Sequence, residues 1–149
     1  MKRILSDLLK GVSTYEIKGS DQLQILELQL DSRKAAKDTL FVALKGSVTD
    51  GHKFVSQAIE KGASAILCQE WPEEILSEIT YVKVKYGRIE IAKVAANFYD
   101  HPSKKMKCVG VTGTNGKTTI ATLLYNLFKD LGYSVGLVST IEILVKEER

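Results

Sequence analysis

The sequence has 149 residues, of which 44% are hydrophobic and 26% charged, as in an ordinary globular protein of about one domain. Its 21 Lys and Arg residues against 18 Asp and Glu residues give a formal net charge of +3. These values exclude a disordered chain, a collagen-like chain and a small disulfide-rich scaffold. The basic residues are too dispersed to favour a nucleic-acid-binding protein.

Two further features of the sequence exclude membrane-spanning and secreted proteins. No apolar stretch approaches the roughly 20 residues that span a membrane, and Asp7 comes too early for a signal peptide. We therefore expect a cytoplasmic protein that does not bind membranes. We also expect it to be a monomer and not to bind nucleic acid. Cys68 and Cys108 each lie in a short apolar run, which predicts buried structural thiols in a reducing compartment.

Helical and strand patterns alternate along the first hundred residues. Apolar residues recur at helical spacing over 4–12, 54–59 and 91–98, and Gly11 and Gly62 are placed to end the first two helices. Alternation at Leu26, Leu28 and Leu30 predicts a strand. Continuous apolar runs at 40–44 and 65–68 predict strands covered on both faces, and 81–84 predicts a strand nearer an edge. This order indicates an α/β fold with a mainly parallel sheet.

The pattern breaks at His101-Pro102-Ser103 and restarts after the lysines at 104–107, so we predict two domains, 1–105 and 106–149. In the second, residues 108–111 predict a short strand, 112–117 a loop and 135–138 the next buried strand. Between them an amphipathic helix ends at Gly132. The apolar stripe of that helix consists of Ile120, Leu123, Leu124, Leu127, Phe128 and Leu131. The unit is thus predicted as strand–loop–helix–strand.

The loop before this helix has the composition of a phosphate-binding loop. A helix N-terminus offers unpaired N–H groups and a partial positive charge, and glycines let the backbone approach phosphate oxygens closely. Lys117 would reach the β- and γ-phosphates, and the Thr118 hydroxyl would bind Mg²⁺. The general spacing of such loops is not met, because Val111 stands five residues before Gly116 where a glycine is expected. The predicted ATP contacts are Gly113, Thr114, Asn115, Gly116, Lys117, Thr118 and Thr119, with Lys117 also catalytic.

The octet from Thr112 to Thr119 resembles the shortened ATP-binding loop of the Mur ligases. The preceding stretches Phe98-Tyr99-Asp100-His101-Pro102-Ser103 and Val109-Gly110-Val111 are similar to the entry of the ATPase domain of the MurE type. Three further segments resemble that type's N-terminal domain, in the same order: Asp31-Ser32-Arg33, Leu40-Phe41-Val42-Ala43-Leu44-Lys45-Gly46 and Asp50-Gly51-His52-Lys53-Phe54.

The resemblance implies an ATP- and Mg²⁺-dependent ligase of peptidoglycan synthesis. Such enzymes join meso-diaminopimelate or L-lysine to UDP-N-acetylmuramoyl-L-alanyl-D-glutamate through an acyl phosphate, from which water must be excluded. The family's uridine nucleotide is held by the N-terminal domain, here 1–105, and its ATP by the central domain, which begins here at 106–149. The matching uridine contacts are Leu30, Ser32, Ser47, Val48 and Thr49.

The family enzymes have three domains, so we expect this chain to be an N-terminal part that is inactive on its own. A MurF-type ligase, which adds D-alanyl-D-alanine, is an alternative, although Thr114 favours the MurE type. A non-catalytic module that binds uridine nucleotides or ATP is a second alternative, while the shortened loop disfavours a GTPase or kinase. Asp31 and Arg33 are either site residues or a structural ion pair. His52 and His101 are expected in turns or caps and not as metal ligands.

Overall fold

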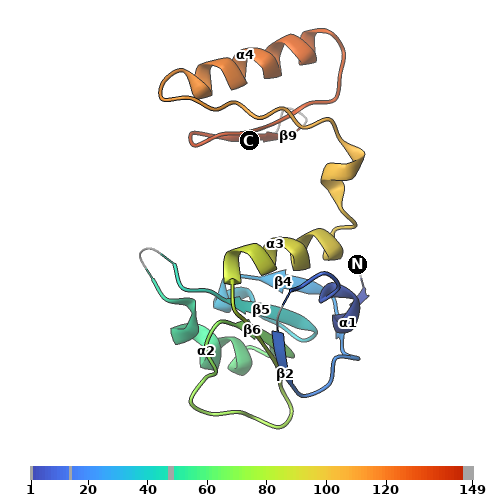
Figure 1. The fold of residues 1–149 in the computed structure, drawn as a ribbon, viewed down its shortest axis with the longest axis vertical. Coiled ribbons are helices and arrows are strands. Elements are labelled where there is room, and N and C mark those ends of the chain that lie inside the picture. Colours follow the sequence, from blue (N-terminus) through green and yellow to red (C-terminus); the bar gives the residue numbers. More distant parts are fainter. Residues whose placement is uncertain (1, 14, 47–48, 146–149) are drawn as a thin grey trace. The chain divides into compact units, whose positions relative to one another are not determined.

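The computed structural model describes residues 2–13, 15–46 and 49–145 (Figure 1). The chain divides into two compact units, Met1–Lys105 and Met106–Arg149. Each unit has its own secondary structure.

A five-stranded sheet in the order β2-β7-β6-β5-β4 forms the centre of the first unit. Its strands are β2 (Tyr15–Lys18), β4 (Glu27–Gln29), β5 (Thr39–Ala43), β6 (Ala65–Cys68) and β7 (Thr80–Val84). Strands β4 to β7 run parallel, and β2 pairs antiparallel with β7. The predicted α/β class with a mainly parallel sheet is therefore confirmed. A separate antiparallel pair joins β1 (Arg3–Ile4) to β3 (Gln24–Ile25).

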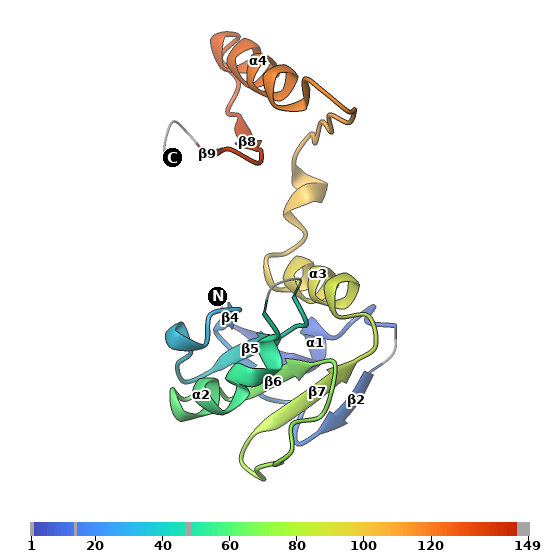
Figure 2. The same ribbon diagram turned by 90° about the vertical axis from the view of Figure 1, so that its left-hand side faces the viewer.

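Helices cover both faces of this sheet (Figure 2). One face carries α1 (Leu5–Leu8) and α3 (Gly87–Phe98), and the other carries α2 (Val55–Glu60). Three 3-10 turns complete the unit: η1 (Ser32–Lys34), η2 (Gly51–Phe54) and η3 (Pro102–Lys105). Because side chains alternate along a strand, β5 sends Leu40 and Val42 toward α1 and α3 and Phe41 and Ala43 toward α2.

The two predicted fully covered strands match the structure closely, since every residue of β5 and β6 is buried. The other strands differ in detail. The alternating segment forms only β4, and Leu30 lies beyond its end with 69% of its surface exposed. Strand β7 is one position inside the edge, because the unpredicted β2 pairs with its outer side. Strand β2 has exposed residues at most of its positions, so it carries little apolar signal.

The second unit contains α4 (Lys117–Asp130) and a hairpin of β8 (Gly136–Val138) with β9 (Ile143–Val145). Helix α4 ends as predicted at Gly132, which has a φ of 83°. The Gly132 N–H donates to the Lys129 carbonyl at 2.8 Å, and the Tyr133 N–H donates to the Phe128 carbonyl at 3.0 Å. This pair of hydrogen bonds is a Schellman motif, which satisfies the last carbonyl groups of the helix.

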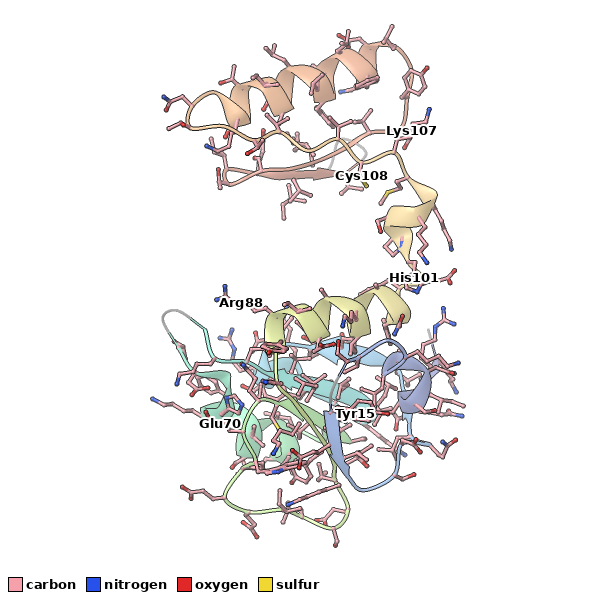
Figure 3. All side chains as sticks on the ribbon, in the orientation of Figure 1. Tyr15, Glu70, Arg88, His101, Lys107 and Cys108 are labelled. Carbon is pink, nitrogen blue, oxygen red and sulfur yellow. The ribbon has the colours of Figure 1, made fainter. Side chains whose placement is uncertain are left out.

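Residues 108–111 do not form the strand that the apolar run predicts. A strand needs a neighbour for its N–H and C=O groups, and within the described residues β8 pairs antiparallel with β9 and no segment pairs with 108–111. The prediction that Cys108 is a buried thiol is therefore wrong: Cys108 is exposed, while Cys68 in β6 is buried as expected. Figure 3 labels Cys108 and Lys107 on the segment that precedes the loop of the second unit.

Candidate functional site

The loop at the start of α4 has the backbone that the sequence predicts. Gly113 has a φ of 148° and Gly116 a φ of 76°, a region that favours glycine. Gly116 is the N-cap of α4 and supplies no side-chain hydrogen bond to the first turn. The N–H groups at the beginning of a helix have no intrahelical acceptor, so the turn at Lys117, Thr118 and Thr119 presents donors to a ligand.

The side chain of Lys117 lies across this loop. Its Nζ donates to the carbonyl oxygens of Gly113 at 2.7 Å and Thr114 at 3.1 Å. Residues 112–117 are exposed, so the ammonium group is accessible, and Thr118 is half-buried as the second residue of α4. A positive charge beside the N-terminus of a helix is suited to bind a phosphate chain.

The donor set fits MgATP in a particular way. Among the described residues, no cluster of three or more His, Cys, Asp or Glu side chains could hold a metal ion. Mg²⁺ commonly takes one or two protein ligands and completes its shell with water and phosphate oxygens. The ligand that the sequence predicts for such an ion is the hydroxyl of Thr118, the second residue of α4.

A second group of predicted site residues follows the carboxyl ends of β4 and β5. Asp31 caps η1, accepting from the Arg33 backbone N–H at 3.1 Å, and its carboxylate forms a two-pronged ion pair with the Arg33 guanidinium at 2.9 and 2.8 Å. The Arg33 side chain, followed by its backbone N–H, lowers the pKa of Asp31 to about 2. The structural interpretation of Asp31 and Arg33 thus has direct support in the geometry.

The predicted uridine contacts occupy different environments. Ser32 is 6% exposed, and its hydroxyl donates to Gln57 Oε1 at 2.5 Å. Leu30 and Thr49 are exposed, and Ser47 and Val48 lie outside the described residues. Since β4 and β5 are adjacent and parallel, Leu30, Ser32 and Thr49 follow the same edge of the sheet. Ligands of open α/β sheets bind at this carboxyl edge.

Both histidines lie in turns, as predicted. His101 follows α3 with a φ of 48°, and its N–H donates to the Ala96 carbonyl at 2.7 Å. His52 does more than the sequence indicates, because its ring joins two neighbouring loops. Nδ1 lies 2.6 Å from Asp50 Oδ1, and Nε2 accepts from the backbone N–H groups of Gln69 and Glu70. No sequence signal identifies contacts between residues this far apart in the chain.

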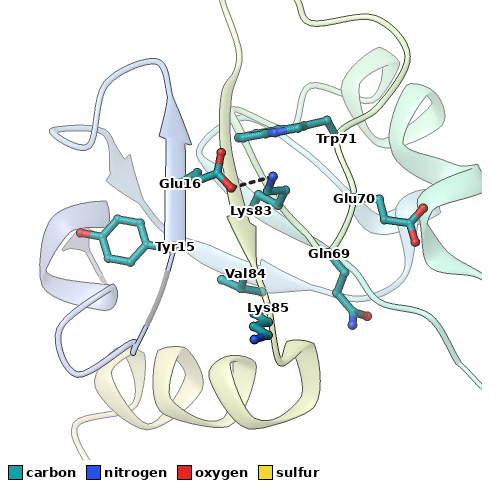
Figure 4. A pocket seen from close by; sticks show the side chains of 8 residues that line it. All are labelled: Tyr15, Glu16, Gln69, Glu70, Trp71, Lys83, Val84 and Lys85. Atoms are coloured by element: carbon teal, nitrogen blue, oxygen red, sulfur yellow. Dashed lines mark ion pairs between the residues drawn. The ribbon is translucent and has the colours of Figure 1, made fainter.

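A cavity of about 520 Å³ lies beside β7 and the loop after β6 (Figure 4). Lys83 Nζ forms an ion pair with Glu16 Oε1 at 2.6 Å and lies 5.0 Å from the centroid of the Trp71 ring, which Lys18 Nζ approaches to 4.5 Å. None of the residues that line this cavity is among the predicted contacts. Those residues are Tyr15, Glu16, Gln69, Glu70, Trp71, Lys83, Val84 and Lys85.

The sequence does not predict the buried carboxylate of Glu90. Glu90 in α3 is 1% exposed and forms an ion pair with Lys93 Nζ at 3.0 Å. Burial opposes ionisation of Glu90, but hydrogen bonds from Lys93 and from the Ser13 N–H outweigh it and lower the Glu90 pKa. Lys93 also donates to Ser13 Oγ at 2.8 Å, so this group ties α3 to the segment after α1.

Within the described residues, no helix has the length and apolar character needed to cross a bilayer.

Comparison with known proteins divides the chain at the same region. The description "Mur ligase family, catalytic domain" matches residues 24–105, and "Mur ligase middle domain" matches residues 111–149. The diaminopimelate ligase of Bacteroides thetaiotaomicron, UDP-N-acetylmuramoyl-L-alanyl-D-glutamate--2,6-diaminopimelate ligase, is 47% identical over 93% of this chain and 29% of that enzyme. The ligase of the same name from Clostridioides difficile is 46% identical over 97% of the chain and 29% of that enzyme.

Two solved structures that resemble this chain in fold carry the name MurF. One from Acinetobacter baumannii superposes with a TM-score of 0.65 at 26% identity, over 88% of this chain and 28% of that one. MurF ligase of Thermotoga maritima, solved in complex with ADP, gives a TM-score of 0.54 at 32% identity, over 70% of this chain and 23% of that one. The chain thus spans about three tenths of the length of the curated relatives.

Proposed function

The chain belongs to the Mur ligase family, and from this premise we propose that it is the nucleotide-binding N-terminal part of a MurE-type ligase. The reaction is the ATP-dependent addition of 2,6-diaminopimelate to UDP-N-acetylmuramoyl-L-alanyl-D-glutamate. We assign the uridine nucleotide to residues 1–105 and ATP to residues 106–149. We also propose that the protein is a monomer located in the cytoplasm.

Sequence identity favours this reaction over the MurF reaction. The relatives named as diaminopimelate ligases are 46% and 47% identical to the chain, whereas the MurF structures are 26% and 32% identical. The printed names of those relatives also favour diaminopimelate over lysine as the amino acid. The choice of amino acid is carried by these names and not by any residue of the loop or of η1.

The observation that carries the proposal is the loop whose glycine N-cap opens α4 beside Lys117. Bound ATP supplies a phosphoryl group that turns a carboxylate into a better electrophile. Lys117 Nζ donates here to the carbonyl oxygens of Gly113 and Thr114. With ATP bound, it would donate instead to the oxygens of the β- and γ-phosphates and balance their negative charge. Thr118 would hold Mg²⁺, and the backbone N–H groups of Gly113 to Thr119 would surround the phosphates.

In the first unit, Leu30, Ser32 and Thr49 are our candidate uridine contacts, together with Ser47 and Val48, which lie outside the described residues. Their position after β4 and β5 supports a ligand at the carboxyl edge of the sheet. The Ser32 hydroxyl already has Gln57 as a partner, so its backbone or a rearranged hydroxyl would make the contact. Asp31 and Arg33 then act by holding the turn on which Ser32 lies.

Two titrations of the ¹⁵N-labelled chain test the two assignments separately. Addition of UDP should shift amide signals around Ser32 and Thr49, and addition of MgATP should shift those of Gly113 to Thr119. CDP serves as the matched control for the uracil base. The absence of any shift at millimolar UDP would contradict the first assignment, and ATP shifts that avoid the loop would contradict the second.

A rate assay tests the expectation that the chain alone is inactive. With UDP-N-acetylmuramoyl-L-alanyl-D-glutamate, diaminopimelate and MgATP, we expect no amino-acid-dependent release of ADP. The relatives that carry this name are more than three times longer than the matched region. Release of ADP that requires diaminopimelate would show that these 149 residues hold a complete ligase site.

A further inference from the structure

His52 connects the loops that follow two neighbouring parallel strands. It lies in η2, after β5, and its Nε2 accepts from the backbone N–H groups of Gln69 at 2.9 Å and Glu70 at 3.2 Å, directly after β6. Its Nδ1 lies 2.6 Å from Asp50 Oδ1. The His52 side chain is 17% exposed and that of Asp50 31%. The ring is therefore largely enclosed between the two loops.

The hydrogen bonds determine the tautomer of the ring. A nitrogen that accepts from two N–H donors carries no proton, so Nε2 is unprotonated. The proton of the neutral imidazole is then on Nδ1, where the Asp50 carboxylate accepts it. The His52 backbone N–H, followed by the ring, donates to the same carboxylate and lowers the pKa of Asp50. Asp50 is thus an ionised acceptor that orients the imidazole.

These contacts form a closed network of hydrogen bonds. Gln69, held at its backbone by His52, accepts from the Lys45 backbone N–H through Oε1 at 3.0 Å. Lys45 pairs with Asp50 as an isolated antiparallel bridge, and Asp50 returns to His52. This network fixes both ends of the segment between β5 and η2. Inside this segment the Gly46 N–H donates to the Thr49 carbonyl at 3.0 Å.

Close packing around the hydrogen-bond network restricts its movement. A Cβ atom on Gly51 would lie 2.8 Å from the backbone N and O of Leu44. A Cβ atom on Gly87, at the start of α3, would lie 2.6 Å from Leu44 Cδ2 and 2.7 Å from Gln69 Cδ. Three chain segments therefore meet without space for a side chain, which favours one arrangement of the carboxyl edge.

We propose that His52 is a positioning residue for the uridine nucleotide. Its Nδ1-protonated ring holds the loops after β5 and β6 together and thereby fixes Thr49, the described candidate contact in the first of these loops. The ring itself touches no ligand. This inference rests on the proposed function, because it concerns the site assigned above to the uridine nucleotide.

Two substitutions at His52 separate its two nitrogens. In His52→Gln, the side-chain Oε1 can take the position of Nε2 and accept from the Gln69 and Glu70 N–H groups. In His52→Asn, the shorter side chain has polar atoms only near the Nδ1 position, so Asp50 keeps a donor and the two N–H groups lose their acceptor. His101→Asn makes the same change in a turn outside this network, at a φ of 48° that Asn tolerates.

The experiment measures the Kd of UDP by calorimetry on the full chain, together with amide exchange of Gln69 and Glu70. We expect His52→Asn to weaken UDP binding about tenfold or more, since two enclosed donors lose their acceptor, and to accelerate exchange at both amides. His52→Gln should restore binding to within about threefold of the wild type, since one acceptor is regained. His101→Asn should bind like the wild type.

A second route to the same readout avoids the imidazole. Gln69→Leu removes the acceptor for the Lys45 N–H and leaves the backbone bonds to His52 in place, so it should also weaken UDP binding. This variant decides the question if His52→Asn does not fold. A long-range ¹H–¹⁵N spectrum should show Nε2 as the unprotonated nitrogen.

The outcomes separate the inference from the proposed function. If the wild-type chain does not bind UDP, the uridine assignment fails and the role of His52 fails with it. If the wild type binds and His52→Asn or Gln69→Leu binds equally tightly, only the positioning role fails. A proton on Nε2 would overturn the inference whatever the affinities are.

Discussion

The Lys117 ammonium group donates to the Gly113 carbonyl oxygen at 2.7 Å, across the loop that precedes α4. This contact keeps the positive charge at the mouth of the loop, four residues along the chain from its partner. A phosphate chain would replace two neutral carbonyl acceptors with charged ones, and hydrogen bonds between charged groups are the stronger. The same side chain is therefore both held in position and available.

Replacement of Lys117 by alanine should weaken MgATP binding. Loss of a charge-assisted hydrogen bond costs about 1.5–3 kcal/mol, or roughly 10- to 150-fold in Kd. Calorimetry with MgATP measures the effect, and Lys107→Ala, an exposed lysine in the preceding segment, is the matched control. Equal affinities of the wild type and Lys117→Ala for MgATP would contradict the phosphate assignment.

The two cysteines should differ sharply in reactivity. Burial raises the pKa of Cys68 to about 11, with Lys83 acting weakly in the opposite direction. At pH 8 about one Cys68 thiol in a thousand is then ionised, and the thiolate is the nucleophile. Cys108 is exposed. A disulfide reagent should therefore modify one thiol quickly in the native protein and the second only after unfolding.

Cys108→Ser provides the control for this experiment, because it should abolish the fast phase and leave the slow one. Mass spectrometry of the modified wild type should place the label on Cys108. A fast label on Cys68 would mean that β6 is open to solvent, against its complete burial in the sheet.

The apolar patterns were sufficient for the inner strands and for α4, because β5 and β6 are covered on both faces and the end of α4 depends on a local glycine. The edge strand β2 and the structure of residues 108–111 were not predictable in this way. Strand β2 is mostly exposed, and the apolar run at Cys108 lacks a pairing partner among the described residues. A run of apolar residues reports a tendency to be buried, and the partner decides whether a strand forms.

The candidate sites show the same division. The loop around Gly116 and Lys117 could be read from the sequence because its residues are contiguous and each has a local role. Asp31 and Arg33 are only two residues apart, and the sequence left open whether they are site residues or a structural ion pair. The contacts of His52 with Gln69 and of Glu90 with Ser13 join distant segments. Only the folded sheet brings these pairs together.

Gly51 should be intolerant of a side chain. A Cβ atom there would meet the Leu44 backbone at 2.8 Å, and backbone atoms cannot yield as a flexible side chain can. Gly51→Ala should reduce stability by about 1–3 kcal/mol, the usual range for overpacking. Urea unfolding followed by circular dichroism measures the loss. Gly110→Ala, where no atom lies within 4 Å of the added Cβ, should leave the free energy of unfolding unchanged.

Arg33 should control the ionisation of Asp31. The Arg33 side chain is the largest cause of the low pKa of Asp31, and its backbone N–H is the second. Arg33→Ala removes the first cause and keeps the second, so the Asp31 pKa should rise from about 2 and stay below its ordinary value of about 3.9. Carboxyl ¹³C titration by NMR measures it. Lys34→Ala, which removes the charge that contributes least to the lowering, should change the pKa only slightly.

The same ion pair predicts how stability depends on pH. The folded-state pKa of Asp31 lies below its unfolded value, so the ionised group stabilises the fold at pH values above about 4, and this contribution disappears as the pH falls toward 2. Asp31→Asn removes the charge and retains an oxygen that can accept from the Arg33 backbone N–H. Wild type should therefore be more stable than Asp31→Asn at pH 6, and the difference should shrink between pH 4 and pH 2. Urea unfolding at several pH values measures the two curves. A constant difference across that interval would mean that the pair contributes no charge-dependent stability, and that Asp31 acts through its cap on η1 alone.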